Sequence, residues 1–167
     1  MKKIILLLAI FVTSSGYSQD QMTQEKLDSI YEKIGDSIEG NSGRWQFKVK
    51  DVVFLAISDS THNRMRIISP IVETFKLTET LKEDALVANF HTALDVKYAI
   101  SDDILWSVFI HPLKELSEDQ VYDAVKQVYF ANITFGTSFS STSLVFPGRS
   151  QQPEVEETPK NFIKRKI

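Results

Sequence analysis

Few residues of this 167-residue chain have the types and spacing that metal or acid–base chemistry needs. The histidines are His62, His91 and His111, and none belongs to a His-Glu-x-x-His pattern that would place two metal ligands on one helix face. His62 falls in an expected turn, His91 on an expected helix and His111 at the end of an expected strand. We therefore predict no metal site and no cofactor.

Carboxylates and hydroxyls give no catalytic pattern either. Asp102 and Asp103 are adjacent, and a hairpin loop explains them well because aspartate favours turns. Ser140, Ser141 and Ser143 lie in a polar run that lacks the Gly-x-Ser-x-Gly elbow of an exposed nucleophile. The glycines form no phosphate-binding loop. We predict no catalytic residues and a protein that is not an enzyme.

Asn89 stands among apolar residues of an expected helix, where a functional role is one interpretation. The other is a buried amide that bonds a nearby backbone. Because buried amides are regularly satisfied in this way, we favour the second interpretation.

The first residues have the layout of a secretory signal peptide. A lysine pair precedes the apolar run Ile4–Val12, and Gly16 and Ser18 occupy the −3 and −1 positions of a cut before Gln19. A run of about nine apolar residues cannot span a bilayer, which needs ~20. We predict that residues 1–18 are removed and that the chain is exported, periplasmic or secreted, with no stable membrane anchor after cleavage.

Charge and composition limit the partners. The chain has 19 basic and 22 acidic residues, so its formal charge is −3, and removal of Lys2 and Lys3 makes it −5. Nucleic-acid binding is disfavoured, because its affinity comes largely from neutralised phosphates. The chain has no cysteine, which excludes disulfides and thiolate metal sites. Residues 147–167 lack apolar periodicity and are predicted to be a disordered tail, which leaves residues 19–146 as a single α+β domain.

Hydrophobic periodicity predicts the elements of the first half of this domain. A helix should begin after Thr23 and end in the segment Gly40–Gly43. Two strands should follow, joined by a tight turn at Lys50-Asp51, and a third strand should begin at Arg64 and end before Pro70, which cannot donate to a sheet. In that third strand Met65 and Ile67 should face the core, and Arg64 and Arg66 should face water.

Two capped helices flank a hairpin in the second half. Thr80 and Glu83 can form a capping box for the first helix, whose buried stripe would include Leu86 and Phe90. Ser117 and Gln120 can do the same for the second helix, which should end at Gly136. The predicted fold is thus α+β, an antiparallel sheet of about five strands with three helices, in the order α-β-β-β-α-β-β-α.

The hairpin's loop length decides which residues face the core. A three-residue loop Ser101–Asp103 places every large apolar residue on one face, with Tyr98, Trp106 and Val108 beneath helices. A two-residue loop of Asp102 and Asp103 would pair Ser101 with Ile104 and mix the faces. We predict the longer loop.

With the longer loop, Leu105 and Phe109 leave apolar area on the face opposite the core. Exposed apolar surface rimmed by charge is typical of a contact site. We therefore predict a partner-binding face that also includes two arginines able to pair carboxylates. Its residues are Arg64, Arg66, Leu105, Phe109 and His111. The alternative is that this chain's own segment Phe139–Phe146 covers that face.

The element order, the run Leu86–Phe90, and the strand end Ile110–Leu113 with Leu116 ahead of a Ser117-capped helix resemble the type III secretion chaperone fold and its YbjN-type relatives. The resemblance spans roughly Leu27 to Phe135. It implies a curved antiparallel sheet with helices on one side, frequent homodimers and binding of extended protein segments. Classical members are cytosolic and keep an effector unfolded, so the export signal makes that task an unexpected one here.

Two functions remain open from the sequence. One is an exported, non-enzymatic interaction module that binds an unidentified protein partner or forms a homodimer. The other is a small-molecule carrier or minor enzyme with a pocket between sheet and helix, where polar groups would converge on His111 or Asn89.

Overall fold

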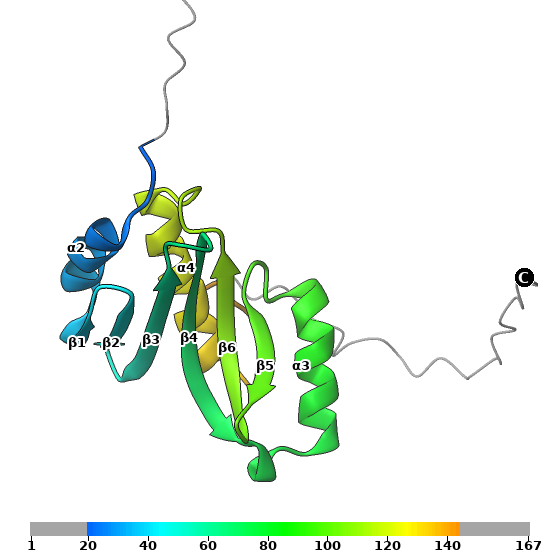
Figure 1. The fold of residues 1–167 in the computed structure, drawn as a ribbon. Helices are drawn as coiled ribbons and strands as arrows, with labels where there is room; N and C mark the ends of the chain where they lie inside the picture. The colour runs from blue at the N-terminus through cyan, green and yellow to red at the C-terminus, as the bar shows by residue number, and fades with distance from the viewer. Residues whose placement is uncertain (1–19, 144–167) are drawn as a thin grey trace, which may run out of the picture. The chain divides into compact units, whose positions relative to one another are not determined.

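The computed structural model describes residues 20–143 (Figure 1). The predictions for residues 1–18 and 147–167 lie outside this part, as does the end of Phe139–Phe146. None of the helices in residues 20–143 combines the length and hydrophobicity needed to cross a bilayer. The elements are α2 (Gln24–Ile34), β1 (Asp36–Asn41), β2 (Arg44–Val49), β3 (Val52–Asp59), β4 (Arg64–Glu73), the 3-10 helix η1 (Thr74–Lys76), α3 (Glu79–His91), β5 (Lys97–Ser101), β6 (Ile104–His111) and α4 (Glu118–Ile133).

The strands form an antiparallel sheet in the order β1-β2-β3-β4-β6-β5, which confirms the α+β class. The sheet has six strands where we expected about five, because β1 was not foreseen. Backbone contacts divide the chain into two compact units. Among the described residues, unit 1 contains 20–67 and Ile110–Val125, and unit 2 contains Ile68–Phe109 and 126–143.

An aromatic cluster forms the core of unit 1. Tyr31 of α2 stacks on Phe47 of β2 with 4.9 Å between ring centroids, and Phe47 stacks on Phe54 of β3 at 5.3 Å. Trp45 meets Tyr31 edge-on and donates its indole N–H to Asp28. These residues alternate with exposed neighbours along β2, so α2 and one face of β2 and β3 enclose the core. The expected tight turn lies at Lys50, whose φ is 55°.

The first helix is shorter than its apolar periodicity predicts. It ends at Gly35, where the next residues turn into β1, although Ile34 and Ile38 keep helical spacing. A Cβ on Gly35 would lie 2.9 Å from the Phe47 ring, so only glycine allows this close approach of the chain to β2. The prediction of a helix reaching Gly40 was therefore wrong.

Strand β4 carries one confirmed and one wrong prediction. Met65 and Ile67 are buried, and Arg64 and Arg66 are exposed, as the alternation predicted. The strand does not end before Pro70 but continues to Glu73. Proline removes one amide donor, yet its fixed φ is compatible with extended backbone.

Unit 2 has its own core, built from β5, β6 and the second half of α4. The Tyr98 hydroxyl donates to the Ala131 carbonyl at 2.9 Å, and the Ser107 hydroxyl donates to the Val128 carbonyl at 3.2 Å. Burial raises the pKa of Tyr98 to about 12. Phe135 and Phe139 pack against the Tyr98 ring, at 5.6 and 6.0 Å. The segment after α4 thus closes the unit 2 core.

The hairpin adopts the register that we rejected. Ser101 pairs with Ile104 and Tyr98 with Ser107, so the loop has two residues. Asp102 and Asp103 both have positive φ, 51° and 60°, as a type I′ turn requires. The mirror-image turn matches the twist of two antiparallel strands, and this local geometry decided the register.

Helix starts were predicted with mixed success. The capping box of α4 is confirmed, because the Ser117 amide donates to Gln120 Oε1 at 2.8 Å and the Gln120 amide donates to Ser117 Oγ at 3.2 Å. The predicted box at Thr80 and Glu83 was wrong. Helix α3 begins two residues earlier, with Thr78 Oγ1 accepting from the Leu81 amide at 3.2 Å.

Candidate protein-binding surfaces

The five residues of the predicted partner-binding face fall in different environments. Arg64, Arg66 and His111 belong to unit 1, where both arginines are exposed and His111 is half-buried. Leu105 and Phe109 belong to unit 2 and are only 3% and 6% exposed. Their assignment to an exposed face was wrong, because the two-residue loop turns them toward the unit 2 core. Partner binding by Arg64, Arg66 and His111 stays a prediction.

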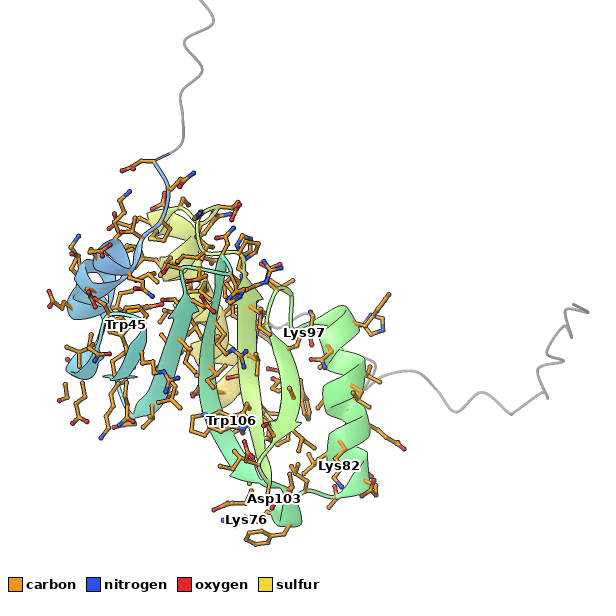
Figure 2. All side chains as sticks on the ribbon, in the orientation of Figure 1. Trp45, Lys76, Lys82, Lys97, Asp103 and Trp106 are labelled. Carbon is orange, nitrogen blue, oxygen red and sulfur yellow. The ribbon has the colours of Figure 1, made fainter. Side chains whose placement is uncertain are left out.

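The same register turns Trp106 outward. Its ring is half-buried on the face of β6 turned to the viewer in Figure 2, while α4 runs behind the sheet. Its indole N–H donates to the Ser101 carbonyl at 3.1 Å. Val108 is half-buried on the same face, so the expectation that both lie beneath helices was wrong.

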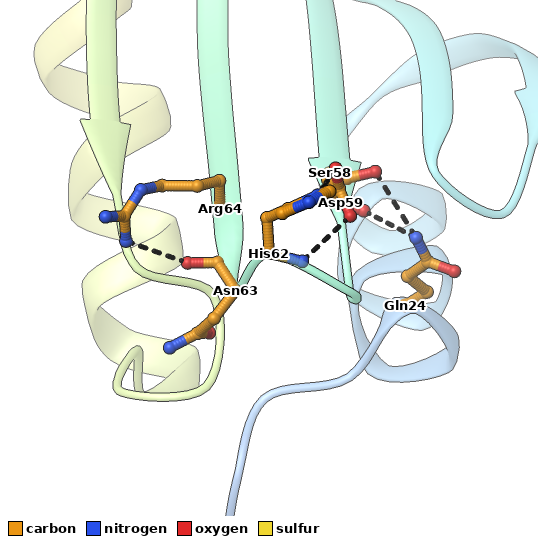
Figure 3. Close-up of polar contacts among 6 residues, drawn as sticks. All are labelled: Gln24, Ser58, Asp59, His62, Asn63 and Arg64. Atoms are coloured by element: carbon orange, nitrogen blue, oxygen red, sulfur yellow. Dashed lines mark hydrogen bonds and ion pairs between the residues drawn. The ribbon is translucent and has the colours of Figure 1, made fainter.

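The histidines have structural partners. The His62 ring approaches Asp59 at 2.6 Å in the turn between β3 and β4 (Figure 3), and this hydrogen bond lowers the pKa of the Asp59 carboxyl. His111 Nδ1 lies 2.8 Å from the Pro112 carbonyl, which can only accept, so Nδ1 is the donor. His91 is exposed and its ring meets Phe90 edge-on at 4.8 Å. Within residues 20–143, no three His, Asp or Glu side chains form a group that could hold a metal.

Asn63 lies in the same turn between β3 and β4 and makes several hydrogen bonds. Its φ is 52°, and its side-chain amide donates to both Glu115 carboxylate oxygens, at 3.1 and 2.9 Å. Its side-chain oxygen accepts from the Lys114 amide at 2.8 Å, and its carbonyl accepts from Arg64 Nη1 at 3.1 Å (Figure 3). These contacts fix the turn from which Arg64 and Arg66 follow.

The favoured interpretation of Asn89 is confirmed. Its amide nitrogen donates to the Tyr98 carbonyl at 3.1 Å, and its amide oxygen accepts from the Tyr98 amide at 2.6 Å. This pair of bonds fastens α3 beside the free edge of β5 (Figure 1). In an antiparallel strand alternate residues point their backbone groups the same way, so Ile100 also directs its amide and carbonyl outward. Ile100 is 53% exposed.

Helix α3 has a second apolar face that meets solvent. Its inward residues Ala85 and Ala88 are buried. On the other side Leu86, Val87 and Phe90 are 68%, 42% and 86% exposed. Residues three or four positions apart share a helix face, so these three side chains form one patch, the α3 outer face. Placing Leu86 and Phe90 in the buried stripe was wrong.

A signal for this patch was present in the sequence. A helix covered on one side should be polar on the other, whereas the second half of α3 is apolar on both. Periodicity shows that two apolar stripes exist, but it does not show which one meets the core. The patch is bordered by Glu83 toward the start of the helix and by Leu94, 49% exposed, after its end. The α3 outer face therefore has the composition of a protein contact.

Comparisons with solved structures bear on the fold. No protein-family model and no curated protein matches the sequence. SycH of Yersinia pestis, a type III secretion chaperone in complex with a stable fragment of YscM2, is similar with a TM-score of 0.51 and 16% identity, over 68% of this chain and 98% of that one. The fold is that of the type III secretion chaperones.

Two further complexes contain chains with the same chaperone-like fold. A chain of the HopA1–SchA chaperone–effector complex is similar with a TM-score of 0.53 and 11% identity, over 67% of this chain and 92% of the matched chain. A chain of the ExsC–ExsE complex is similar with a TM-score of 0.52 and 11% identity, over 67% of this chain and 95% of the matched chain. The resemblance noted in the sequence is thereby confirmed at the level of fold.

Proposed function

We propose that this chain is a non-enzymatic protein-interaction module that forms a homodimer through the α3 outer face. The observation that carries the proposal is the exposure of Leu86, Val87 and Phe90 on one side of α3. Burying one such large side chain contributes about 1.5–3 kcal/mol, and in a symmetric dimer each residue counts twice. In the proposed dimer this patch forms the centre of a self-complementary interface, in which both copies bury the same three side chains.

The comparisons support a binding role. The similar chains include SycH, described as a chaperone in complex with a YscM2 fragment, and a chain of a chaperone–effector complex. These descriptions of chains with the same fold support our proposal that this chain holds another polypeptide. The partner is proposed to be a protein, and the sheet and α3 are proposed to do the holding without turnover.

The hydrogen bonds of Asn89 and His111 disfavour the alternative of a small-molecule carrier or minor enzyme. It required polar atoms converging on Asn89 or His111. Both amide atoms of Asn89 are bonded to Tyr98, and His111 Nδ1 is bonded to the Pro112 carbonyl. Neither group is offered to a ligand through these atoms, so the interaction module is the better proposal.

Export is part of the proposal and rests on residues 1–18 alone. Exported chain should begin at or near Gln19. N-terminal sequencing of material recovered outside the cytoplasm tests this prediction. An intact Met1 in that material would contradict it.

Self-association is tested with charge placed on the α3 outer face. We expect Phe90→Asp to weaken association at least about tenfold, because a carboxylate would be buried against the partner's apolar side chains. Sedimentation equilibrium measures the effect. Phe75→Asp is the matched control, since Phe75 is 81% exposed but lies on η1, outside the patch.

Folding must be shown to persist in both variants, by circular dichroism and by unchanged thermal midpoints. Equal association of the Phe90→Asp variant and the unsubstituted chain would exclude the α3 outer face as the interface. An equal loss of self-association in the Phe75→Asp variant would show that the effect is not specific to α3.

A further inference from the structure

The outer face of the unit 1 sheet combines an apolar row with positive charge on both sides. On β2, Arg44 and Lys48 are exposed and alternate with the buried Trp45 and Phe47. On β4, Arg64 and Arg66 are exposed and alternate with buried Met65 and Ile67. Strand β3 lies between them in the sheet order.

The middle strand supplies the apolar row. Leu55 and Ile57 alternate with buried Phe54 and Ala56. The register pairs Arg44 with Ile57 and Gln46 with Leu55, so these side chains share the outer face. Leu55 is half-buried and Ile57 is 37% exposed. We name the set Arg44, Lys48, Leu55, Ile57, Arg64 and Arg66 the cationic strip.

Three of the four cations have no polar partner within the described residues. Within the described residues the side chains of Arg44, Lys48 and Arg66 make no hydrogen bond or ion pair, and the Arg64 side chain donates only to the Asn63 carbonyl. The chain as a whole has an excess of acidic residues, so a group of unpaired cations on one face is a local departure from its charge. Such a group is available to carboxylates from outside.

Acidic residues border the strip without neutralising it. Asp36 of β1 is in register with Lys48, yet no ion pair joins them, and Glu39 is opposite Gln46. Asp59 at the end of β3 is held by His62. The positive charge therefore remains concentrated on β2 and β4.

Strand geometry fixes the spacing that a ligand must match. Arg44 and Lys48 are four residues apart on one strand, or ~13 Å, and Arg64 and Arg66 are two residues apart, or ~7 Å. Strands β2 and β4 are two strand spacings apart, or ~10 Å. A segment lying along β3 would thus place apolar side chains on Leu55 and Ile57 and carboxylates on both flanks, where arginine binds them bidentately.

We propose that the cationic strip binds an acidic segment of another protein, in which apolar residues are flanked by carboxylates on both sides. This inference rests on the proposed role as a protein-interaction module and names the chemistry of its partner. It does not depend on self-association through α3. The strip is a second surface, in unit 1, whereas the α3 outer face belongs to unit 2.

The test is binding of a labelled peptide by the full chain, followed by fluorescence anisotropy. The probe alternates pairs of Glu with single Leu residues, and comparison peptides replace Glu with Lys or Leu with Ser. We expect binding of the first peptide alone, weakening as salt screens exposed charges. Lys48→Glu and Arg66→Glu should each weaken it about fivefold or more, and Arg66→Lys should restore most of the affinity.

Lys126→Glu is the matched control, because Lys126 is exposed on α4, outside the strip. It makes the same change in net charge and should alter affinity less than about twofold. Equal weakening by Lys126→Glu, or no binding by the unsubstituted chain, would overturn the proposal. Binding only by a chain shortened after Ser143 would overturn it too, since the occupant would then be this chain's own C-terminal segment.

The Phe90→Asp variant separates this proposal from the preceding one. It should bind the acidic peptide as the unsubstituted chain does, even where self-association is lost. Loss of peptide binding in that variant would contradict an independent strip. Unchanged self-association in Arg66→Glu would show that the two surfaces act separately.

Discussion

Two buried tyrosines differ in what their hydroxyl groups bond. Tyr98 donates to the Ala131 carbonyl at 2.9 Å in unit 2. The Tyr31 hydroxyl in unit 1 is buried among aromatic rings and has no hydrogen-bond partner among the described residues. Burial raises the pKa of Tyr31. A buried hydroxyl without a hydrogen-bond partner destabilises the folded state, whereas a buried hydroxyl that is hydrogen-bonded stabilises it.

Phenylalanine at these two positions should therefore have opposite effects. We expect Tyr31→Phe to raise the free energy of unfolding by about 1 kcal/mol, because it removes an unpaired polar atom. Tyr98→Phe should lower it by about 1 kcal/mol, because it leaves the Ala131 carbonyl without that donor. Urea denaturation of both variants provides the measurement. Destabilisation of similar size in both would contradict this account of unit 1.

At the scale of elements, the β5–β6 hairpin shows how two residues decide which side chains are buried. Asp102 and Asp103 adopt positive φ, and the resulting two-residue turn buries Leu105 and Phe109 and turns Trp106 outward. A register change of one residue exchanges the faces of a strand. The turn is thus the origin of the wrong face assignment.

The turn can be tested by substitution at Asp103. Asp103→Gly should raise the free energy of unfolding by about 0.5–1 kcal/mol, because glycine has no Cβ penalty at a φ of 60°. Asp103→Val should lower it by about 1 kcal/mol or more, since a β-branched residue disfavours that conformation. Thermal or urea denaturation of the two variants shows whether each substitution raises or lowers the free energy of unfolding. Stabilisation by valine relative to glycine would be inconsistent with a type I′ turn.

Sequence reasoning succeeded where the signal was local. The Ser117–Gln120 capping box, the burial of Met65 and Ile67, and the bonding of Asn89 to backbone follow from neighbouring residues. The α+β class follows from the order of periodic segments.

Predictions from the sequence were wrong where contacts between residues far apart in the chain determine the structure. The first helix ends and strand β1 begins where Gly35 lies close to Phe47, a contact that no local pattern encodes. The exposure of Leu86 and Phe90 depends on which of two apolar stripes on α3 meets the sheet. Of the predicted site, Arg64 and Arg66 were placed correctly on an exposed face, whereas Leu105 and Phe109 were not.

At the scale of the whole molecule, two surfaces of different chemistry are proposed to bind protein. The α3 outer face is apolar, with Phe90 86% exposed. The cationic strip has two exposed arginines on β4 and an exposed arginine and lysine on β2. Because salt screens exposed charges but strengthens or leaves unchanged apolar contacts, the two surfaces should respond differently to ionic strength.

The most direct test is the mass of the full chain in solution, measured by sedimentation at low and at high salt. Association through the α3 outer face predicts a species of twice the 19.0 kDa polypeptide mass at both salt concentrations, with Phe90→Asp shifting it toward monomer. A monomer throughout the micromolar range, or a dimer that high salt dissociates and Phe90→Asp leaves intact, would contradict the proposal.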